Sequence, residues 1–500
     1  MRIRRVRVRA AALVGFALTA AACGSHERVA AQRESLRKLA HLTADQSNFG
    51  VILDAKSGKA LAAFRVNNPI RAAIPDGAGG WYIGGGFIHV NGILRKRLAH
   101  IGDDGTLDPD WKPEANGNGV SVTSLARIGS RLYVAGDFAQ LNRKPRLHIG
   151  AFDIESGKVS AWAPRGTAPA PYVLRPAAGH LLIGGYGAFG SGLVAFDAET
   201  GEHAPEWRGR VDTSNIEGGS VRLLSELSGR LYLAGMFGSV DHVPTPGLAS
   251  VDARTGRLDR QWRPHVDERF CGGCGQVTAL ASAPGAIYAA LPEQLRALDP
   301  RTGAFERWRA PISAVTGFYG GTSANALAVA GGSVYATGDF DRIRGVRRNG
   351  FAALDERTGR VRPSWQPPAA WVYGTLLVPS GDRLLLGVTL ARQLQFSFTG
   401  LKTYRPVRTL RLTLALNGPG RVRIGLGQGC DEKKWEQSSS LRCGGKLVRR
   451  LATVRFDHAQ RKRYVHRLAV PRGAYFVHFV PQMPKGVPLP SVQDFPIVVP

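Results

Sequence analysis

The 500-residue sequence predicts an all-β protein built from a repeated unit and followed by a smaller all-β module. Three observations lead to this prediction. Short runs alternate apolar and polar residues with period two, 62 Gly and 30 Pro residues separate these runs, and one eight-residue phrase recurs. Such alternation is typical of half-buried strands, and frequent Gly and Pro favour turns over long helices. The 44% share of hydrophobic residues indicates a folded chain.

Residues 1–22 are predicted to be a signal peptide that is removed. Five Arg precede an apolar run of thirteen residues, which is too short to span a bilayer. The Ala-Ala-Ala-Cys sequence at its end resembles a bacterial lipobox, although Ala20 stands where Leu is usual. We therefore expect lipid attachment at Cys23, with an ordinary secretory signal as the alternative. Residues 23–48 are polar and are expected to tether the protein to the outer side of the membrane.

One phrase recurs at steps of about 50 residues, a period typical of propeller blades. Its clearest copies are RLYVAGDF at 131–138, RLYLAGMF at 230–237 and SVYATGDF at 333–340, and weaker copies begin at 81, 180, 286 and 383. A second phrase, similar to LDxxTGxxxxxW, follows the first six copies, and a shorter variant of it occupies 99–111. Each pair of phrases predicts four short strands, which form the sheet of one blade.

The N-terminal segment is predicted to close the ring of blades. The last copy, at 372–390, lacks a second phrase, whereas FGVILDAKSGKALAAF at 49–64 is a second phrase without a first. Strands from both segments in one sheet would leave no exposed sheet edge. The expected fold of residues 49–398 is therefore a seven-bladed β-propeller.

The paired phrases resemble those of a known family. The LYxxGDF…LDxxTGxxxxW unit is similar to the delta-60 repeat of secreted bacterial β-propeller lipoproteins. That resemblance implies an extracellular repeat protein without a general enzymatic activity. The LDxxTGxxxW half also resembles the quinoprotein repeat, which quinone dehydrogenases share with non-catalytic outer-membrane assembly lipoproteins. The dehydrogenases' adjacent cysteines have no counterpart in this sequence, so we expect no cofactor.

The repeated Asp and Trp residues are interpreted as structural. Each Asp stands four residues before a Gly, a spacing typical of a turn whose carboxylate accepts N–H groups. Equivalent positions in successive blades cannot converge on one catalytic or calcium site. The predicted turn residues are Asp54, Asp153, Asp197, Asp252, Asp299 and Asp355. The Trp residues expected to pack between blades are Trp111, Trp162, Trp207, Trp262, Trp308 and Trp365.

The remaining cysteines form two local pairs. Cys271 and Cys274 stand in a CxxC, and Cys430 and Cys443 flank a polar loop. Disulfides are the default for such pairs in an exported protein. A zinc site would need two further ligands beside the CxxC, and only His265 is close, so no metal is expected.

Basic loops are the predicted binding surface. Loops between the second and third strands of a blade should share one rim with the connections between blades, and loops on a rigid scaffold often carry binding. A solvated surface without a ligand is the alternative interpretation. The candidate anion-binding residues are Arg95, Lys96, Arg97, Arg143, Lys144, Arg146, Arg342, Arg344, Arg347 and Arg348.

Residues 399–500 are predicted to form a small, basic, immunoglobulin-like β-sandwich, because short alternating strands follow one another there. Residues 401–500 hold 19 Lys/Arg against 5 Asp/Glu, a net charge of +14 and half of the chain's formal +28. Such charge favours anionic partners such as teichoic acids, acidic polysaccharides or phospholipid head groups. Nucleic acid is not expected as a partner of an exported chain without a nucleic-acid-binding motif.

These features lead us to expect a monomeric, lipid-anchored binding protein of the cell envelope, without catalytic activity. Its partner would be an envelope protein or an anionic cell-wall polymer. One alternative is a propeller enzyme that acts on carbohydrate or lactone substrates in the central channel, and another is an outer-membrane assembly scaffold. Carboxylates or histidines that converge at the channel mouth would favour the enzyme, and an Arg-rich rim would favour binding.

Overall fold

A computed structural model of the chain describes residues 48–389 apart from several loops, together with the strands between 395 and 499. The residues of 48–389 outside this description are 118, 166–169, 187–191, 214–218, 265–276, 314–322, 349, 366 and 368–372. Strands are the only regular elements of the described chain, which includes no helix long and apolar enough to cross a membrane. The signal peptide, Cys23, nearly all of the tether, and the pairs Cys271/Cys274 and Cys430/Cys443 lie outside the described residues, so those expectations stay predictions.

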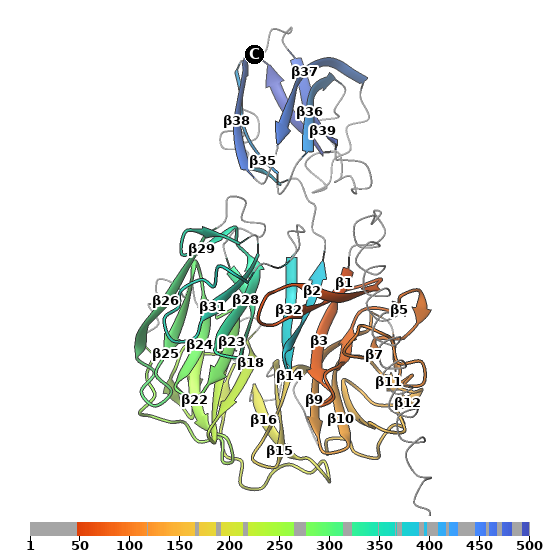
Figure 1. The fold of residues 1–500 in the computed structure, drawn as a ribbon, viewed down its shortest axis with the longest axis vertical. Helices are drawn as coiled ribbons and strands as arrows, with labels where there is room; N and C mark the ends of the chain where they lie inside the picture. Colours follow the sequence, from red (N-terminus) through yellow and green to blue (C-terminus); the bar gives the residue numbers. More distant parts are fainter. Residues whose placement is uncertain are drawn as a thin grey trace, which may run out of the picture.

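The chain before residue 390 folds into successive antiparallel units of one design (Figure 1). In one of them, β9 (Ser121–Ile128) pairs with β10 (Arg131–Asp137), which pairs with β13 (Ile149–Asp153). The corresponding strands of the other units are β3 (Ile70–Pro75), β4 (Trp81–Gly85) and β7 (Leu98–Ile101); β14 (Ala170–Ala177), β15 (His180–Tyr186) and β16 (Leu193–Asp197); β18 (Ser220–Leu227), β19 (Arg230–Met236) and β22 (Leu248–Asp252); β23 (Ala279–Ala283), β24 (Ala286–Leu291) and β25 (Gln294–Leu298); and β27 (Ser323–Ala330), β28 (Ser333–Asp339) and β31 (Phe351–Asp355).

The fourth strand of a unit is shorter than the sequence predicts. It is complete in β26 (Phe305–Ser313), which pairs with β25, and in β2 (Ala60–Val66), which pairs with β1 (Asn48–Asp54). In the unit of β9 it is a single bridge from Phe152 to Val159. Beyond that bridge the chain turns inward, and Trp162 packs in one cluster with Leu181 of the following unit. Burial of the Trp between two units therefore ends the ladder early. All six of the predicted packing Trp residues are buried.

The two ends of the repeat region share one sheet. β1 (Asn48–Asp54) pairs along its length with β33 (Arg383–Thr389), and the strand order is β32 (Tyr373–Ser380), β33, β1 and β2 (Ala60–Val66). In Figure 1 the first strands of the chain accordingly lie beside β32, far from them in sequence. The predicted pairing of 49–64 with 372–390 is therefore present. It begins one residue early, because Asn48 is already in the ladder.

The first strand of each unit is called here its innermost strand, because these strands contact one another. β3 contacts β9, and the contacts continue in chain order through β14, β18, β23 and β27 to β32. β32 in turn contacts β3, so the series of contacts returns to its first member.

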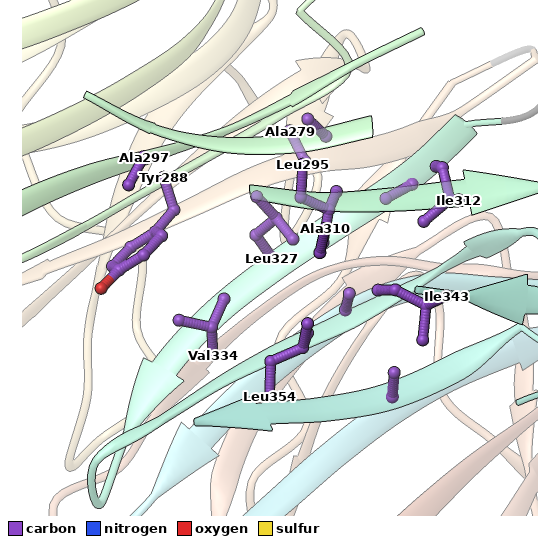
Figure 2. Packing of buried hydrophobic residues seen from close by; sticks show 14 of the residues in the cluster. Ala279, Tyr288, Leu295, Ala297, Ala310, Ile312, Leu327, Val334, Ile343 and Leu354 are labelled. Atoms are coloured by element: carbon purple, nitrogen blue, oxygen red, sulfur yellow. The ribbon is translucent and has the colours of Figure 1, made fainter. Parts of the chain in front are cut away.

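Apolar side chains from adjacent units interleave to form the core. Figure 2 shows one such cluster, in which Leu295 and Ile312 of one unit pack near Leu327, Val334 and Leu354 of the next. Alanines at the same interface, among them Ala279, Ala310 and Ala336, are also buried, and their small size lets the two sheets approach closely. A single sheet cannot bury both faces, so each unit depends on its neighbours.

Two antiparallel sheets lie where the basic sandwich is predicted. One has the order β34 (Gln395–Ser397), β35 (Thr409–Leu416) and β38 (Gln460–Arg467), and the other has the order β37 (Lys446–Phe456), β36 (Gly420–Gln428), β39 (Gly473–Gln482) and β40 (Gln493–Val499). The pairing of β34 with β35 places residues 395–397 in the C-terminal module. This pairing begins before the boundary expected at 398/399, which stays a prediction.

The shared sheet yields a first prediction about Gly50. A Cβ at this position would lie 2.0 Å from Cζ of the buried Phe64 ring. We expect Gly50→Ala to lower the free energy of unfolding by roughly 1–3 kcal/mol, because an overpacked core must shift. Urea unfolding of the purified variant measures the change. Gly86→Ala is the matched control, since its Cβ would meet only Asn68 Cβ, at 3.6 Å. Equal midpoints for the two variants would contradict the prediction.

Candidate functional site

Each unit has two distinct ends. Gly85 at the end of β4 pairs with Ile70 at the start of β3, so innermost strands begin where the middle strands end. The hairpins that follow the middle strands lie at this end, which we call the hairpin face. The turns that hold the repeated Asp residues, such as 54–58, lie at the opposite end, which we call the turn face.

Four short hairpins at the hairpin face tie neighbouring units together in the described chain. In the first of them, β5 (His89–Val90) pairs with β6 (Ile93–Leu94) and also with β2 of the preceding unit. The second hairpin is β11 (Gln140–Leu141) with β12 (Lys144–Pro145), and its β11 also pairs with β8 (Ala115–Asn116). The third is β20 (Ser239–Val240) with β21 (Val243–Pro244), and its β20 also pairs with β17 (Val211–Asp212). The fourth is β29 (Arg342–Ile343) with β30 (Val346–Arg347), and its β29 also pairs with β26.

Three of the candidate anion-binding residues hold their hairpins in place instead of forming the rim. Arg95 is only 6% exposed, and its guanidinium donates to the carbonyls of Asp108 and Pro109 at 3.0 and 3.1 Å. Arg146 donates to the Ser160 carbonyl at 2.9 Å, and Arg348 donates to the Arg362 carbonyl at 3.2 Å.

The acceptors of these bonds share one location. Asp108, Ser160 and Arg362 each directly follow the residue that forms the single bridge of the fourth strand. A longer fourth strand would have placed these carbonyls in a ladder with N–H donors. An arginine guanidinium donates to each of them instead. The sequence carries a signal for this role, because each of these arginines stands eight residues after the Phe that closes the first phrase, as Arg146 stands after Phe138.

Some of the other candidate residues are partnered, some are exposed, and Arg342 and Arg344 are both. Lys96 Nζ pairs with Glu114 at 3.0 Å, and Arg97 Nε donates to the Val120 carbonyl at 3.4 Å. Arg342 donates to Gly345 within its own hairpin, and Arg344 donates to the Arg309 carbonyl. Arg143, Lys144, Arg342, Arg344 and Arg347 are exposed, and they are the members of the predicted rim that face solvent.

Large apolar side chains are exposed beside these basic residues. Ile93 and Leu94 at one hairpin tip are 52% and 53% exposed, and Leu147 beside Arg146 is 69% exposed. Val346, next to Arg347, is exposed as well. The hairpin face therefore presents a mixed apolar and basic surface, which the sequence analysis missed because it considered only charge.

A ring of bulged residues, absent from the sequence analysis, lies at the same end. In each of six innermost strands the ladder skips one residue near its start, which is the signature of a β-bulge. The skipped residues are Arg71, Thr123, Tyr172, Arg222, Asn325 and Thr375. Thr278 stands just before β23 at the equivalent place. All are exposed or partly exposed, although their neighbours in the strands are largely buried.

Side chains of this ring bond from unit to unit. Thr278 Oγ1 donates to the Ala324 carbonyl at 2.6 Å, and Asn325 Nδ2 donates to the Gly374 carbonyl at 3.4 Å. Thr375 Oγ1 donates to the Ile70 carbonyl at 3.1 Å, and Thr123 makes a longer contact with Pro171. In every case the acceptor directly precedes the next bulged residue.

Arg71, Tyr172 and Arg222 occupy the ring positions that lack a Thr or Asn. The Arg222 guanidinium lies 5.8 Å from the centroid of the Tyr172 ring, and its Nε donates to Ser220 Oγ at 3.0 Å. Tyr172 is 46% exposed, and Arg71 is exposed. The arc from Arg71 to Arg222 thus holds two guanidinium groups and an aromatic ring, with Thr123 between Arg71 and Tyr172, and within it Tyr172 and Arg222 are neighbours. Sequence spacing could have shown that these positions are equivalent, but not that their side chains meet.

The turn face uses its carboxylates internally. Asp54 Oδ1 accepts hydrogen bonds from the Ser57 N–H at 2.7 Å and the Ser57 hydroxyl at 2.6 Å. The Ser57 hydroxyl is the main cause that lowers the pKa of Asp54 below its ordinary value, and the turn N–H groups add to the effect. Asp153, Asp197, Asp252, Asp299 and Asp355 make the corresponding bonds within their own turns.

The same turns also lock adjacent units together. Trp162 Nε1 donates to the Asp197 carbonyl of the next unit at 3.1 Å, and Trp262 bonds to Asp299 in the same way. The middle-strand Tyr takes part as well, since Tyr335 OH donates to the Ala55 carbonyl at 2.7 Å. The Tyr of the first phrase therefore has a bonding role that sequence analysis did not assign.

A histidine between two carboxylates also lies at the turn face. His100 Nε2 is 3.0 Å from Asp76 and its Nδ1 is 2.9 Å from Asp108, while its ring stacks on Tyr82. Burial raises the pKa of both carboxyl groups, but hydrogen bonds from His100 and the backbone lower it overall. Among the described residues, no group of three or more His, Cys, Asp or Glu side chains is placed to hold a metal ion.

No family model and no curated protein sequence matches the chain. Its fold is similar to the extracellular domain of a hybrid two-component system from B. thetaiotaomicron, with 11% identity and a TM-score of 0.42 over 86% of this chain and 57% of that one. It is also similar to Kuenenia stuttgartiensis hydrazine synthase, with 12% identity and a TM-score of 0.36 over 58% and 77% of the two chains. The chain spans a little over half the length of the first structure. Likeness at this level carries no argument about function.

The anchoring role of Arg146 predicts an effect on stability. Arg146→Ala removes the donor to the Ser160 carbonyl, so we expect the free energy of unfolding to fall by about 1–3 kcal/mol. Lys144→Ala in the same hairpin is the control, and as an exposed substitution it should change stability by no more than about 0.5 kcal/mol. Denaturant midpoints measure both variants. An Arg146→Ala midpoint equal to that of Lys144→Ala would rule out the anchoring role.

The turn carboxylates predict a pH dependence. Because the folded pKa of Asp54 lies below its ordinary value of 3.8, the charged side chain stabilises the fold above pH 3.8 and loses this effect as the pH falls through the lowered value. The difference in denaturant midpoint between the unmodified protein and Asp54→Ala should therefore be largest near neutral pH and should narrow in acid. A difference that widens as the pH falls would contradict this assignment.

Proposed function

We propose that residues 48–389 form a closed seven-bladed β-propeller that binds an anionic polymer of the cell envelope through its hairpin face. In this proposal a lipid on Cys23 anchors the protein outside the cytoplasm, and the C-terminal sheets form a basic immunoglobulin-like module. The protein acts as a binding protein and not as an enzyme.

Three structural features support a closed ring. The contacts between innermost strands return from β32 to β3, and β1 from the start of the region pairs with β33 from its end. The hydrogen bond from Thr375 to Ile70 joins the last unit to the first, just as Thr278 joins two units in the middle of the chain.

The exposed hairpin tips are the observation that carries the binding proposal. Arg143, Lys144 and Arg342 are exposed on a scaffold whose other polar groups at this end are largely bonded internally. Exposed basic groups close to exposed Leu147 and Val346 offer both charge attraction and apolar contact to a partner. The net charge of +14 within residues 401–500 extends the same preference to the C-terminal module.

The residues at the start of the innermost strands also favour binding over hydrolysis. The ring of bulged residues consists of arginine, threonine, asparagine and tyrosine side chains. Carbohydrate hydrolysis commonly uses a pair of carboxyl groups. The described cluster of His100 with two carboxylates lies at the turn face, away from this ring.

Charge reversal at the hairpin tips tests the proposal. We expect the triple variant Arg143→Glu, Lys144→Glu and Arg342→Glu to bind immobilised lipoteichoic acid at least about tenfold more weakly than the unmodified protein at low salt. The control variant makes the same change in charge at the turn face, with Lys59→Glu, Arg257→Glu and Arg360→Glu, which directly follow turn glycines and are exposed. Surface plasmon resonance of residues 24–500, the mature chain without the predicted lipidation site Cys23, measures both.

Salt provides the second arm of this experiment. Binding should weaken between about 0.05 M and about 0.5 M NaCl, because exposed charges are screened over this range. Neutral dextran should not bind. Equal losses of affinity in the two variants, or binding that salt does not change, would overturn the assignment of the hairpin face as a polyanion site.

A further inference from the structure

We propose that the ring of bulged residues at the hairpin face binds a carboxylated sugar, a uronic acid. The inference rests on the proposed binding role and specifies the group recognised at the centre of that face. It follows from how hydrogen-bond donors and acceptors are divided around the ring.

The arc from Arg71 to Arg222, which also holds Thr123, supplies charged donors. Arg71 and Arg222 occupy positions where other units carry Thr or Asn, and a guanidinium is a fork of donors that fits the two oxygens of a carboxylate. Arg222 is held from two sides, because its Nε donates to Ser220 Oγ at 3.0 Å and its guanidinium lies 5.8 Å from the centroid of the Tyr172 ring. Such restraint lowers the entropy cost of binding an anion.

The remaining arc supplies acceptors. A Thr hydroxyl has one proton and two lone pairs. The proton of Thr278 is committed to the Ala324 carbonyl at 2.6 Å, and that of Thr375 to the Ile70 or the Gly387 carbonyl, each at 3.1 Å. What these partly or fully exposed oxygens still offer to a ligand is their lone pairs. A ligand that fits this arc must donate hydrogen bonds.

This division selects the chemistry of the ligand. A neutral sugar would donate to the threonine oxygens but would offer the guanidinium groups no negative charge. An acetate ion would pair with the arginines and leave the threonine oxygens without a donor, and a phosphate ion would pair with the arginines but carries fewer hydroxyl groups than a sugar. A uronic acid carries a carboxylate and several hydroxyl groups on one pyranose ring, so it matches both arcs. The exposed face of Tyr172 adds an aromatic surface of the kind that packs on the C–H groups of a sugar.

The repeat itself supplies substitutions that preserve the fold. Thr is the residue that the equivalent positions 123, 278 and 375 carry. Arg71→Thr and Arg222→Thr would therefore give these two units the Thr side chain that already bonds to the next unit at other positions of the ring. Arg257→Thr removes an exposed arginine from the turn face and is the matched control.

Binding of D-glucuronate to the mature chain tests the inference, with D-glucose, acetate and inorganic phosphate as parallel probes. Saturation-transfer NMR detects binding, and titration gives the affinity. We expect D-glucuronate to bind more tightly than each of the three other probes. The double variant Arg71→Thr/Arg222→Thr should lower the D-glucuronate affinity by about tenfold or more, since charge-assisted hydrogen bonds are lost. Its unfolding midpoint should be unchanged or higher, and Arg257→Thr should bind normally.

The outcomes separate this inference from the proposed function. Loss of D-glucuronate binding in the double variant, with normal binding in the charge-reversed hairpin variant, supports a site in the ring. Equal D-glucuronate affinity in the double variant and in Arg257→Thr overturns it, whatever the hairpin variant does with lipoteichoic acid. Phosphate or acetate binding as tight as D-glucuronate binding overturns the assignment to a sugar. If the hairpin variant and its turn-face control lose affinity for lipoteichoic acid equally, while the D-glucuronate results are as expected, only the polymer proposal is overturned.

Discussion

The antiparallel pairing of β1 with β33 is the constraint on which the rest of the structure depends. Without β1 and β2, the last unit would keep only β32 and β33, and Tyr335 would lose the Ala55 carbonyl as its partner. Ala55 N–H also bonds to the Asp382 carbonyl, so the turn face of this unit is assembled from both chain ends. Each unit buries its faces only against its neighbours. The sheet shared by the two chain ends therefore gives the first and last units neighbours of this kind as well.

The two ends of each unit use their polar groups differently. At the turn face the repeated Asp carboxylates, several Trp indoles and the middle-strand Tyr hydroxyls bond to one another or to backbone groups, which leaves little for a ligand. At the hairpin face the same repeat positions vary in residue type, and some of their side chains remain exposed. Internal bonding and exposed, variable side chains thus lie at opposite ends of the strands. This division explains how a strongly repeated sequence can hold a locally unique surface.

The sequence was sufficient to predict the first three strands of each unit, the shared sheet of the chain ends and the strand-rich C-terminal module, because period-two alternation and repeated phrases report these features directly. It was not sufficient for the roles of individual arginines. Arg143 and Arg146 are three residues apart and equally basic, yet one is exposed and the other completes a shortened strand. The ring of bulged residues was also missed, because a register shift such as the one at Arg222 arises from strand pairing and not from a local residue pattern.

The register of β1 and β33 has a mechanical consequence. Asn48 at the start of β1 pairs with Thr389 at the end of β33. The chain that precedes β1 and the chain that follows β33 towards the C-terminal sheets therefore leave from adjacent points. A force that pulls these two segments apart would act across the ladder and open its hydrogen bonds one pair at a time, as a zipper opens. Resistance to load would then come from the side chains packed around this seam, Phe49 and Val388 among them, and not from the shearing of many bonds at once.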